Sequence, residues 1–226
     1  MKRLFLLSSL MVLSISCGSG SSPSSSSGSN SSGFSWNGPI ILTTIESGIV
    51  FAEIATQTGP TTNATITLTS ANSPAVLTYQ TSGSYPVTAN GSVTILNLAY
   101  YTNSSFTYAA NQPYTITAVF GGNTYQATTT TVGTPVFSTS GSNVVCTWTG
   151  GGNANIITAS ESISPYTTKV FGPSVSSPYS IPTSTLPGPT GDNDILANVI
   201  NLNSSAFTGT SNGSYFAAIS QALGVY

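Results

Sequence analysis

Acidic side chains are the first candidates for chemistry in this sequence, because it contains no histidine. The absence of histidine excludes Ser-His-Asp and Cys-His nucleophilic arrangements and the usual zinc sites. Hydrolysis of a glycosidic bond needs two carboxylates that face each other across a cleft, and the formal pairs are Glu46 with Glu53 and Glu161 with Asp194. No Gly-rich phosphate-binding loop is present. We therefore expect a non-catalytic protein, with a carbohydrate-active enzyme as a distant alternative.

Oxygen atoms of the kind that calcium prefers occur together at one place in the chain. Gly191-Asp192-Asn193-Asp194 holds two carboxylates and an amide oxygen in a short loop. The later glutamate of a complete calcium-binding loop is missing, and a polar turn leading into a strand explains the same residues. We favour the plain turn, keep Asp192, Asn193 and Asp194 as a weak calcium candidate, and expect no metal and no cofactor.

Four aromatic residues gather around a polar run at 102–105, namely Tyr100, Tyr101, Phe106 and Tyr108. The polar run indicates a long connection between strands. Aromatic rings combine apolar area with, in tyrosine, a hydroxyl, so this cluster is a candidate for stacking on a sugar or packing on a partner protein. More often such rings cover one end of a hydrophobic core, and we favour this interpretation.

The first residues have the composition of an export signal. Lys2 and Arg3 give a positive start, and 4–13 is an apolar stretch interrupted by two serines. This stretch is too short to span a membrane, which needs roughly 20 apolar residues. A positive start, an apolar middle and small residues before a cut are typical of a secretory signal peptide.

The end of this segment, Leu13-Ser14-Ile15-Ser16-Cys17-Gly18, resembles the lipobox of bacterial lipoproteins. It departs from the commonest pattern, because Ser14 stands where leucine is usual. The resemblance implies that 1–16 is a lipoprotein signal peptide and that Cys17 carries two or three acyl chains, enough for stable membrane attachment. Gly18, in place of the aspartate that retains lipoproteins at the inner membrane, implies an outer-membrane or cell-surface location. The alternative is ordinary secretion with cleavage near Ser16.

A flexible tether is expected after the lipidation site, over 17–38. The part from 18 to 33 contains only Ser, Gly, Pro, Asn and no apolar side chain to offset the entropy of ordering. A coil of 16 such residues has a root-mean-square span of about 22 Å. The tether therefore holds the folded part of the chain clear of the lipid headgroups.

Charge is scarce in the processed chain, which keeps one base, Lys169, and all five acids, a formal charge of 1 − 5 = −4. A single cationic side chain cannot neutralise several phosphates, so binding to a nucleic-acid backbone is excluded. Electrostatic docking to anionic lipid is excluded for the same reason. The membrane contact is therefore expected through the N-terminal lipid, and the partners through envelope proteins or glycans.

Abundant Thr, Ser, Asn, Val, Ile and Tyr favour strands and turns over helices, and the apolar fraction of 39% is ample for a core. We predict an all-β protein with two tandem antiparallel sandwiches, at 39–132 and 133–226. Expected strands of the first unit are 48–55, 63–70, 76–79, 92–98 and the hairpin 114–131, with turns at 72–74, 82–84, 90–91 and 121–123.

The second unit is expected to begin with 136–138 and to continue through the strand that contains Cys146. Val144, Cys146 and Trp148 share one face of that strand, so we expect a buried, unreactive thiol. Further expected strands are 156–162, 169–171, 179–181 and 195–202. The last segment, 214–226, has both helical spacing and strand-like composition, and we favour a closing strand.

The second unit resembles bacterial fibronectin type III-like and immunoglobulin-like domains. The likeness rests on Val144 to Thr149 with its tryptophan, the glycine run after it, and Ser177-Pro-Tyr-Ser-Ile-Pro182 before Leu186-Pro-Gly188. It implies a sandwich without the disulfide of antibody domains. The sequence thus predicts a lipid-anchored binding, adhesion or structural module of the cell envelope. The alternative is a periplasm-facing assembly component that works through a sheet edge.

Overall fold

The computed structural model describes residues 38–226 apart from 47, 57–58, 71–73, 90–91, 163–165, 173, 205–206 and 211–213; within 85–96 it describes the backbone alone. The signal segment, Cys17 and the tether thus lie outside the described residues. The strands are β1 (Ile40–Glu46), β2 (Ile49–Thr56), β3 (Gly59–Pro60), β4 (Thr65–Thr69), β5 (Ala75–Ala89), β6 (Ser92–Asn103), β7 (Pro113–Phe120), β8 (Asn123–Thr130), β9 (Val136–Ser140), β10 (Asn143–Thr147), β11 (Ile156–Glu161), β12 (Thr168–Phe171), β13 (Tyr179–Pro182), β14 (Asn193–Asn203) and β15 (Tyr215–Val225). A single 3-10 turn at Thr183–Thr185 is the only helical element among these residues. The predicted all-β sandwich class is confirmed.

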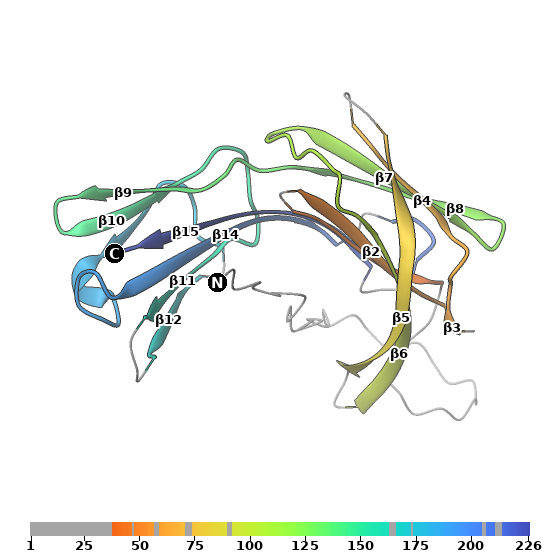
Figure 1. Ribbon diagram of the computed structural model, residues 1–226, viewed down its shortest axis with the longest axis horizontal. Helices are drawn as coiled ribbons and strands as arrows, with labels where there is room; N and C mark the ends of the chain where they lie inside the picture. The colour runs from red at the N-terminus through yellow and green to blue at the C-terminus, as the bar shows by residue number, and fades with distance from the viewer. Residues whose placement is uncertain are drawn as a thin grey trace, which may run out of the picture.

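Two sheets make up the described part of the chain (Figure 1). The larger sheet has the order β12-β11-β14-β15-β1-β2-β6-β5-β4-β7-β8, with β3 paired to β2, and the smaller has the order β13-β10-β9. The larger sheet folds over itself at β5, which pairs with β4 up to Leu77 and with β6 from Thr78 onward. A register shift between Tyr79 and Thr81 accompanies this bend, as expected of a β-bulge.

Each hydrophobic core lies between two layers of strands. One core cluster lies between β1, β2 and β6 and the layer of β4, β7 and β8, with members such as Ile54 and Ile116. A second cluster lies between β11 and β14 and the layer of β10 and β13, with Cys146 and Ile181 among its members. Period-2 alternation forms these cores; β7, for instance, buries Tyr114, Ile116, Ala118 and Phe120 and turns the residues between them outward.

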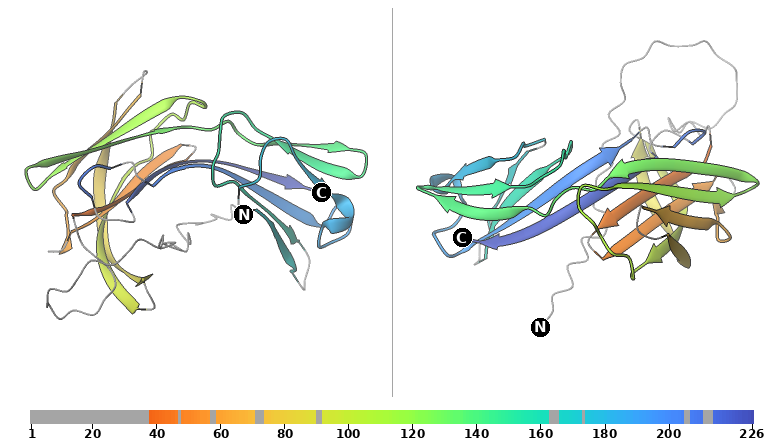
Figure 2. Two further views of the ribbon diagram at one scale, coloured as in Figure 1. Left: turned by 180° about the vertical axis from the view of Figure 1, so that it is seen from behind. Right: turned by 90° about the horizontal axis from the view of Figure 1, so that it is seen from above.

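Strands β14 and β15 run through both halves of the molecule (Figure 2). They pair with each other over their whole length, and the first part of β15 also pairs with β1 in parallel, from Leu42 opposite Tyr215 to Ile45 opposite Ala218. Phe216 consequently packs in the first core cluster. The boundary predicted between residues 132 and 133 falls in the connection from β8 to β9.

Several sequence predictions can be compared with these elements. The hairpin at 114–131 is confirmed as β7 and β8, and the C-terminal segment is a strand, as favoured. The turn predicted at 82–84 is wrong, because these residues lie inside the long strand β5, where they pair with β6. The predicted turn residues 72–73 and 90–91 lie outside the described residues. Strand β1 was not predicted.

Candidate functional site

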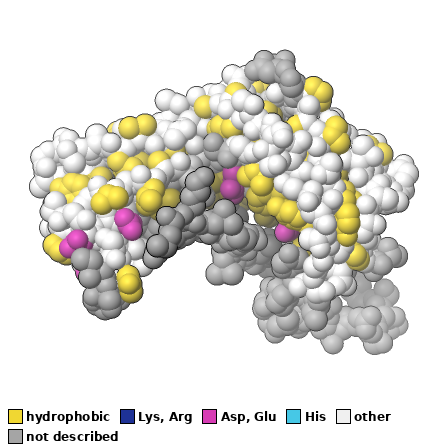
Figure 3. Space-filling view, in the orientation of Figure 1, with side chains coloured by type: hydrophobic (Ala, Val, Ile, Leu, Met, Phe, Trp, Pro, Cys, Tyr) yellow, Lys and Arg dark blue, Asp and Glu magenta, His cyan; other side chains and the backbone are white. Residues whose placement is uncertain are grey.

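The side of the larger sheet that faces away from the two cores forms the inside of an arch. Figure 3 shows acidic side chains beside hydrophobic ones on this inner side. We call it the concave face and define it by Leu42, Phe51, Glu53, Tyr100 and Tyr215. Its apolar floor is a third cluster of buried side chains, Ile40, Leu42, Ala55 and Leu98, against which Tyr215 packs.

One row of side chains crosses four neighbouring strands of the concave face. Tyr215 of β15 lies opposite Leu42 of β1, Leu42 opposite Glu53 of β2, and Glu53 opposite Tyr100 of β6. Residues that face each other in register project from the same side of a sheet. The Glu53 carboxylate therefore has the Tyr100 ring on the neighbouring strand β6 and the Tyr215 ring two strands away on its other side, on β15.

A second row lies two residues further along the strands and adds another ring. Thr44 lies opposite Phe51, and Phe51 opposite Thr102. The rings of Phe51 and Tyr100 have centroids 6.0 Å apart at an interplanar angle of 34°. This tilted arrangement falls in the range of favourable aromatic pairs, so the two rings form a common apolar platform next to Glu53.

The carboxylates of the concave face lie in a partly desolvated environment. Burial raises the pKa of Glu53 and that of Glu46 above their ordinary value of 4.5. Burial also raises the pKa of Tyr215, to which the charge of Glu53 adds, while a hydrogen bond with Thr44 lowers it in part. Lys169, the only basic residue among those described, contacts Thr185 O at 3.0 Å and lies over the Phe171 ring instead.

The sequence had singled out Tyr100 and Glu53 separately, and the structure brings them together. Phe51 and Tyr215 were missed. The spacing of Phe51 and Glu53 shows that they share one face of a strand, but only the register of four strands places Tyr100 and Tyr215 beside them. Chemically, the concave face offers an acceptor that attracts hydroxyl or ammonium donors, flanked by rings that can cover apolar parts of a ligand.

The formal catalytic pairs are not brought together. Glu46 lies opposite Ile49 and Glu53 opposite Leu42, so four residue steps, about 13 Å along the strands, separate the two carboxylates. That exceeds the roughly 5–9.5 Å of glycosidase pairs. Glu161 lies opposite Asn193 and Asp194 opposite Ser160, so Glu161 and Asp194 project from opposite faces of the sheet.

The four aromatic residues predicted as one cluster do not lie together in the structure. Tyr100 and Tyr101 lie in strand β6 and not in a connection, so they face opposite sides. Tyr101 is buried, donates to Thr61 O at 2.6 Å and accepts from Ala64 N at 2.9 Å. The Tyr108 hydroxyl donates to Val132 O and accepts from Val132 N, while the Phe106 ring meets Tyr114 edge-on, with centroids 5.4 Å apart.

The weak calcium candidate is organised around a buried amide. The Asn193 Oδ1 atom accepts a hydrogen bond from Gly188 N at 2.8 Å, and its Nδ2 donates to the backbone oxygens of Gly188, Pro189 and Tyr226. Asp194 projects from the opposite face to Asn193. Asn193 thus stabilises the turn, and the described residues contain no group of three His, Cys, Asp or Glu side chains suited to a metal ion.

The predicted burial of Cys146 is confirmed, because its side chain is fully buried with Val144 and Trp148 in the second core cluster. Burial raises the pKa of its thiol to about 11. Across the described ranges, no helix combines the length and the apolar character needed to cross a membrane. No protein-family model matches the chain, and no curated protein matches it either.

Proposed function

We propose that this protein is a non-catalytic, lipid-anchored binding module of a bacterial cell envelope, and that it holds a glycan on its concave face. The observation that carries the proposal is Glu53, a half-buried carboxylate in one row with Tyr100 and Tyr215. Phe51 adds a further ring beside Tyr100. Half-buried rings can pack on the apolar faces of a sugar, and a carboxylate beside them can accept hydrogen bonds from its hydroxyl groups.

The physical argument concerns how a sugar is recognised. Its ring has apolar C–H faces, which pack on aromatic side chains, and hydroxyl groups, which donate to carboxylates. A partly desolvated carboxylate gains more from such donors than a fully hydrated one, because less water has to be displaced when the ligand binds. The concave face also runs across several strands, so it can take an extended chain of sugars.

Charge decides which glycans fit. The only basic side chain outside the first three residues is Lys169, which lies on β12 and away from the row around Glu53. Anionic polysaccharides would therefore be repelled by Glu46 and Glu53 without any compensating cation. We propose uncharged glycans and amino-sugar polymers as the ligand class, with the second bound more tightly.

The anchor is proposed from the sequence around Cys17, which resembles a lipobox, and from the Ser/Gly-rich tether after it. Two or three acyl chains on Cys17 would hold the module at the outer membrane or the cell surface. The fibronectin type III-like character proposed for the second half is supported by its strand arrangement. There, β13-β10-β9 covers β12-β11-β14-β15, the seven-stranded count of such sandwiches.

Calorimetry with matched tetrasaccharides tests the ligand class. We expect binding of the glucosamine tetramer, weaker binding of the N-acetylglucosamine tetramer and no binding of a heparin tetrasaccharide. Glu53→Gln should weaken the glucosamine tetramer about tenfold or more, since a hydrogen bond to a charged group is lost. Glu161→Gln changes the net charge equally but lies elsewhere, so it should leave affinity unchanged. Equal loss in both variants, or tight binding of the heparin fragment, would contradict the proposal.

Anchoring is tested by labelling cells with a radioactive fatty acid and by proteinase K treatment of intact cells. Wild type should carry the label and be degraded on intact cells, whereas Cys17→Ala should be unlabelled and released or held in the periplasm. Labelling of Cys17→Ala would refute the lipidation site. Protection of wild type until the outer layer is breached would instead indicate a periplasm-facing protein.

A further inference from the structure

Strand β15 has a free edge beyond the end of β1. Its first residues, Tyr215–Ala218, pair with β1, and on its other side it pairs with β14 over its whole length. After Ala218 the described residues provide no strand on the β1 side, and β1 itself ends at Glu46. No strand among the described residues therefore pairs with the stretch 221–225 on this side, and we call this stretch the free edge.

The hydrogen-bonding pattern fixes which residues of the free edge have unused backbone groups. Asn193 N donates to Tyr226 O at 2.9 Å, and Tyr226 N donates to Asn193 O at 2.8 Å. In an antiparallel pair such doubly bonded positions recur at every second residue. Even-numbered residues of β15 thus bond to β14, while Gln221, Leu223 and Val225 direct their N–H and C=O groups outward.

Three other edge strands of the described structure, β8, β12 and β13, carry features that hinder strand addition. Along β8, the Nδ2 groups of Asn201 and Asn203 donate to Thr130 O and Thr128 O, each at 2.9 Å. The outer strand β12 carries Lys169, and β13 ends at Pro182. Charged side chains, proline and covering groups are the usual means of preventing strand addition.

The free edge has none of these protections. Its residues, Gln221-Ala-Leu-Gly-Val225, include no charge and no proline. The side chains of Leu223 and Val225 are 63% and 69% exposed, among the most exposed large hydrophobic residues in the described structure. An uncharged edge with outward apolar side chains favours the addition of another uncharged strand.

We propose that this strand is β15 of a second copy of the chain, in an antiparallel pair centred on Leu223. In that register Leu223 lies opposite Leu223 of the second copy, and Gln221 lies opposite its Val225. All three positions have outward backbone groups in both copies, so three pairs would each exchange two hydrogen bonds. A pair centred on Ala222 would instead pair Val225 with Ile219 of the second copy. The register of β1 places Glu46 next to Ile219, so this edge position is already occupied.

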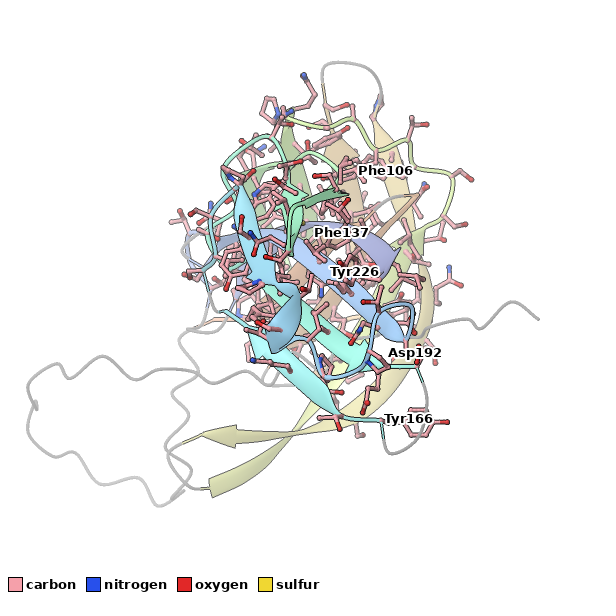
Figure 4. The ribbon with its side chains drawn as sticks, turned by 90° about the vertical axis from the view of Figure 1, so that its left-hand side faces the viewer. Phe106, Phe137, Tyr166, Asp192 and Tyr226 are labelled. Carbon is pink, nitrogen blue, oxygen red and sulfur yellow. The ribbon has the colours of Figure 1, made fainter. Side chains whose placement is uncertain are left out.

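The small residues of the free edge also fit a two-fold pair. The centred register places Gly224 opposite Ala222 of the second copy, on the side of the sheet that faces β9. A methyl group at Gly224 would lie 2.8 Å from the Phe137 ring. Phe137 and Tyr226 line a cavity of about 120 Å³ between β9 and β15, near the end of the sandwich seen in Figure 4. Small side chains in both copies thus leave room for both Phe137 rings.

The pairing has a consequence for binding, and this consequence, unlike the pairing itself, rests on the proposed function. The symmetry axis of an antiparallel strand pair is perpendicular to the sheet, so both concave faces would point the same way. A glycan polymer could then engage two sites at once, with a gain in avidity from the raised effective concentration.

Disulfide formation tests the register without any ligand. In a Cys17→Ala background, Leu223→Cys should form a disulfide-linked dimer under mild oxidation, because doubly bonded partners have Cα atoms about 5.5 Å apart, within disulfide range. Gln221→Cys alone should not, whereas a mixture of Gln221→Cys and Val225→Cys should. Buried Cys146 is present in every sample as a constant background. Equal yields for all three preparations would overturn the register.

Sedimentation velocity tests the pairing itself. The Cys17→Ala protein should sediment as a reversible dimer at high concentration. Adding the substitution Leu223→Lys, at an exposed position, should make it a monomer. Unfolding curves should show that Leu223→Lys is as stable as its parent. A parent protein that is monomeric at every concentration would overturn the proposal. So would a monomer that binds a foreign extended segment through the same edge, which would indicate an assembly partner instead.

Discussion

The two faces of the larger sheet differ in what they carry. The covered face contributes Ile45, Ile54 and Tyr101 to the first core cluster, and the buried polar residues of the described structure are all uncharged. The concave face of the same strands carries Glu53 and Tyr100, each next to one of those residues in sequence. On β2, Ile54 faces the core and its neighbour Glu53 faces the concave side, so the cost of partly burying a charge falls on the concave side only. The comparison suggests a division in which the covered face provides stability and the concave face carries the proposed binding site, and substitutions on each face can test it.

The largest difference between the faces should appear at two neighbours on β2. Ile54 is fully buried, so Ile54→Ala should lower the free energy of unfolding by about 2–5 kcal/mol. Glu53→Gln should leave it unchanged or raise it slightly at neutral pH, because the half-buried charge is removed. Urea unfolding measures both. A larger loss for Glu53→Gln than for Ile54→Ala would contradict the division.

Removal of the Tyr101 hydroxyl should have the second-largest effect on stability. Tyr101→Phe leaves Thr61 O and Ala64 N without their partner, which should cost about 1–3 kcal/mol of stability. Glycan affinity should not change, because this hydroxyl lies on the covered face. Thermal unfolding and calorimetry on the same sample separate the two effects. Weaker glycan binding with unchanged stability would place Tyr101 in the binding site instead.

The pH dependence of stability sharpens the comparison further. Burial raises the pKa of Glu53 in the folded state above its ordinary value of 4.5, so the folded state binds that proton more tightly than the unfolded chain. The resulting stabilisation is present below about pH 4.5 and is lost as the pH rises through the folded pKa. The stability of Glu53→Gln relative to wild type should therefore increase from pH 3.5 to pH 7. A decrease over that range would contradict the assignment.

The smallest effect concerns a thiol on the covered side of the second half. Burial raises the pKa of Cys146 to about 11, so at pH 8 little thiolate forms and a disulfide reagent cannot reach it. Cys17→Ala protein should react only after denaturant is added. Fast reaction of the folded protein would show that the second core is open.

The sequence predicted the elements whose pattern is local. The hairpin of β7 and β8 was readable from its alternation and its glycine turn, and the burial of Cys146 followed from its neighbours on one strand face. Strand β1 was missed because the run Ile40–Glu46 is buried on both faces over most of its length and shows no alternation. The glycine at 83 suggested a turn, but pairing of β5 with β6 overrode that preference.

The candidate site was only half predictable, because it depends on register. Tyr100 and Glu53 were each visible as residues with chemistry, yet they are separated by the whole of β3, β4 and β5 in the chain. Tyr215 enters the same row only through the parallel pairing of β15 with β1. Such a long-range pairing has no signature in local composition.

Mapping of the binding surface by NMR tests the central claim most directly. Isotope-labelled Cys17→Ala protein is titrated with the glucosamine tetramer, and the backbone amide signals are followed. We predict that shifts concentrate at Phe51, Glu53, Tyr100 and Tyr215 and are absent from the covered residues Ile116 and Ile181. Saturable shifts confined to other surfaces, or no shifts at all, would contradict the assignment of binding to the concave face.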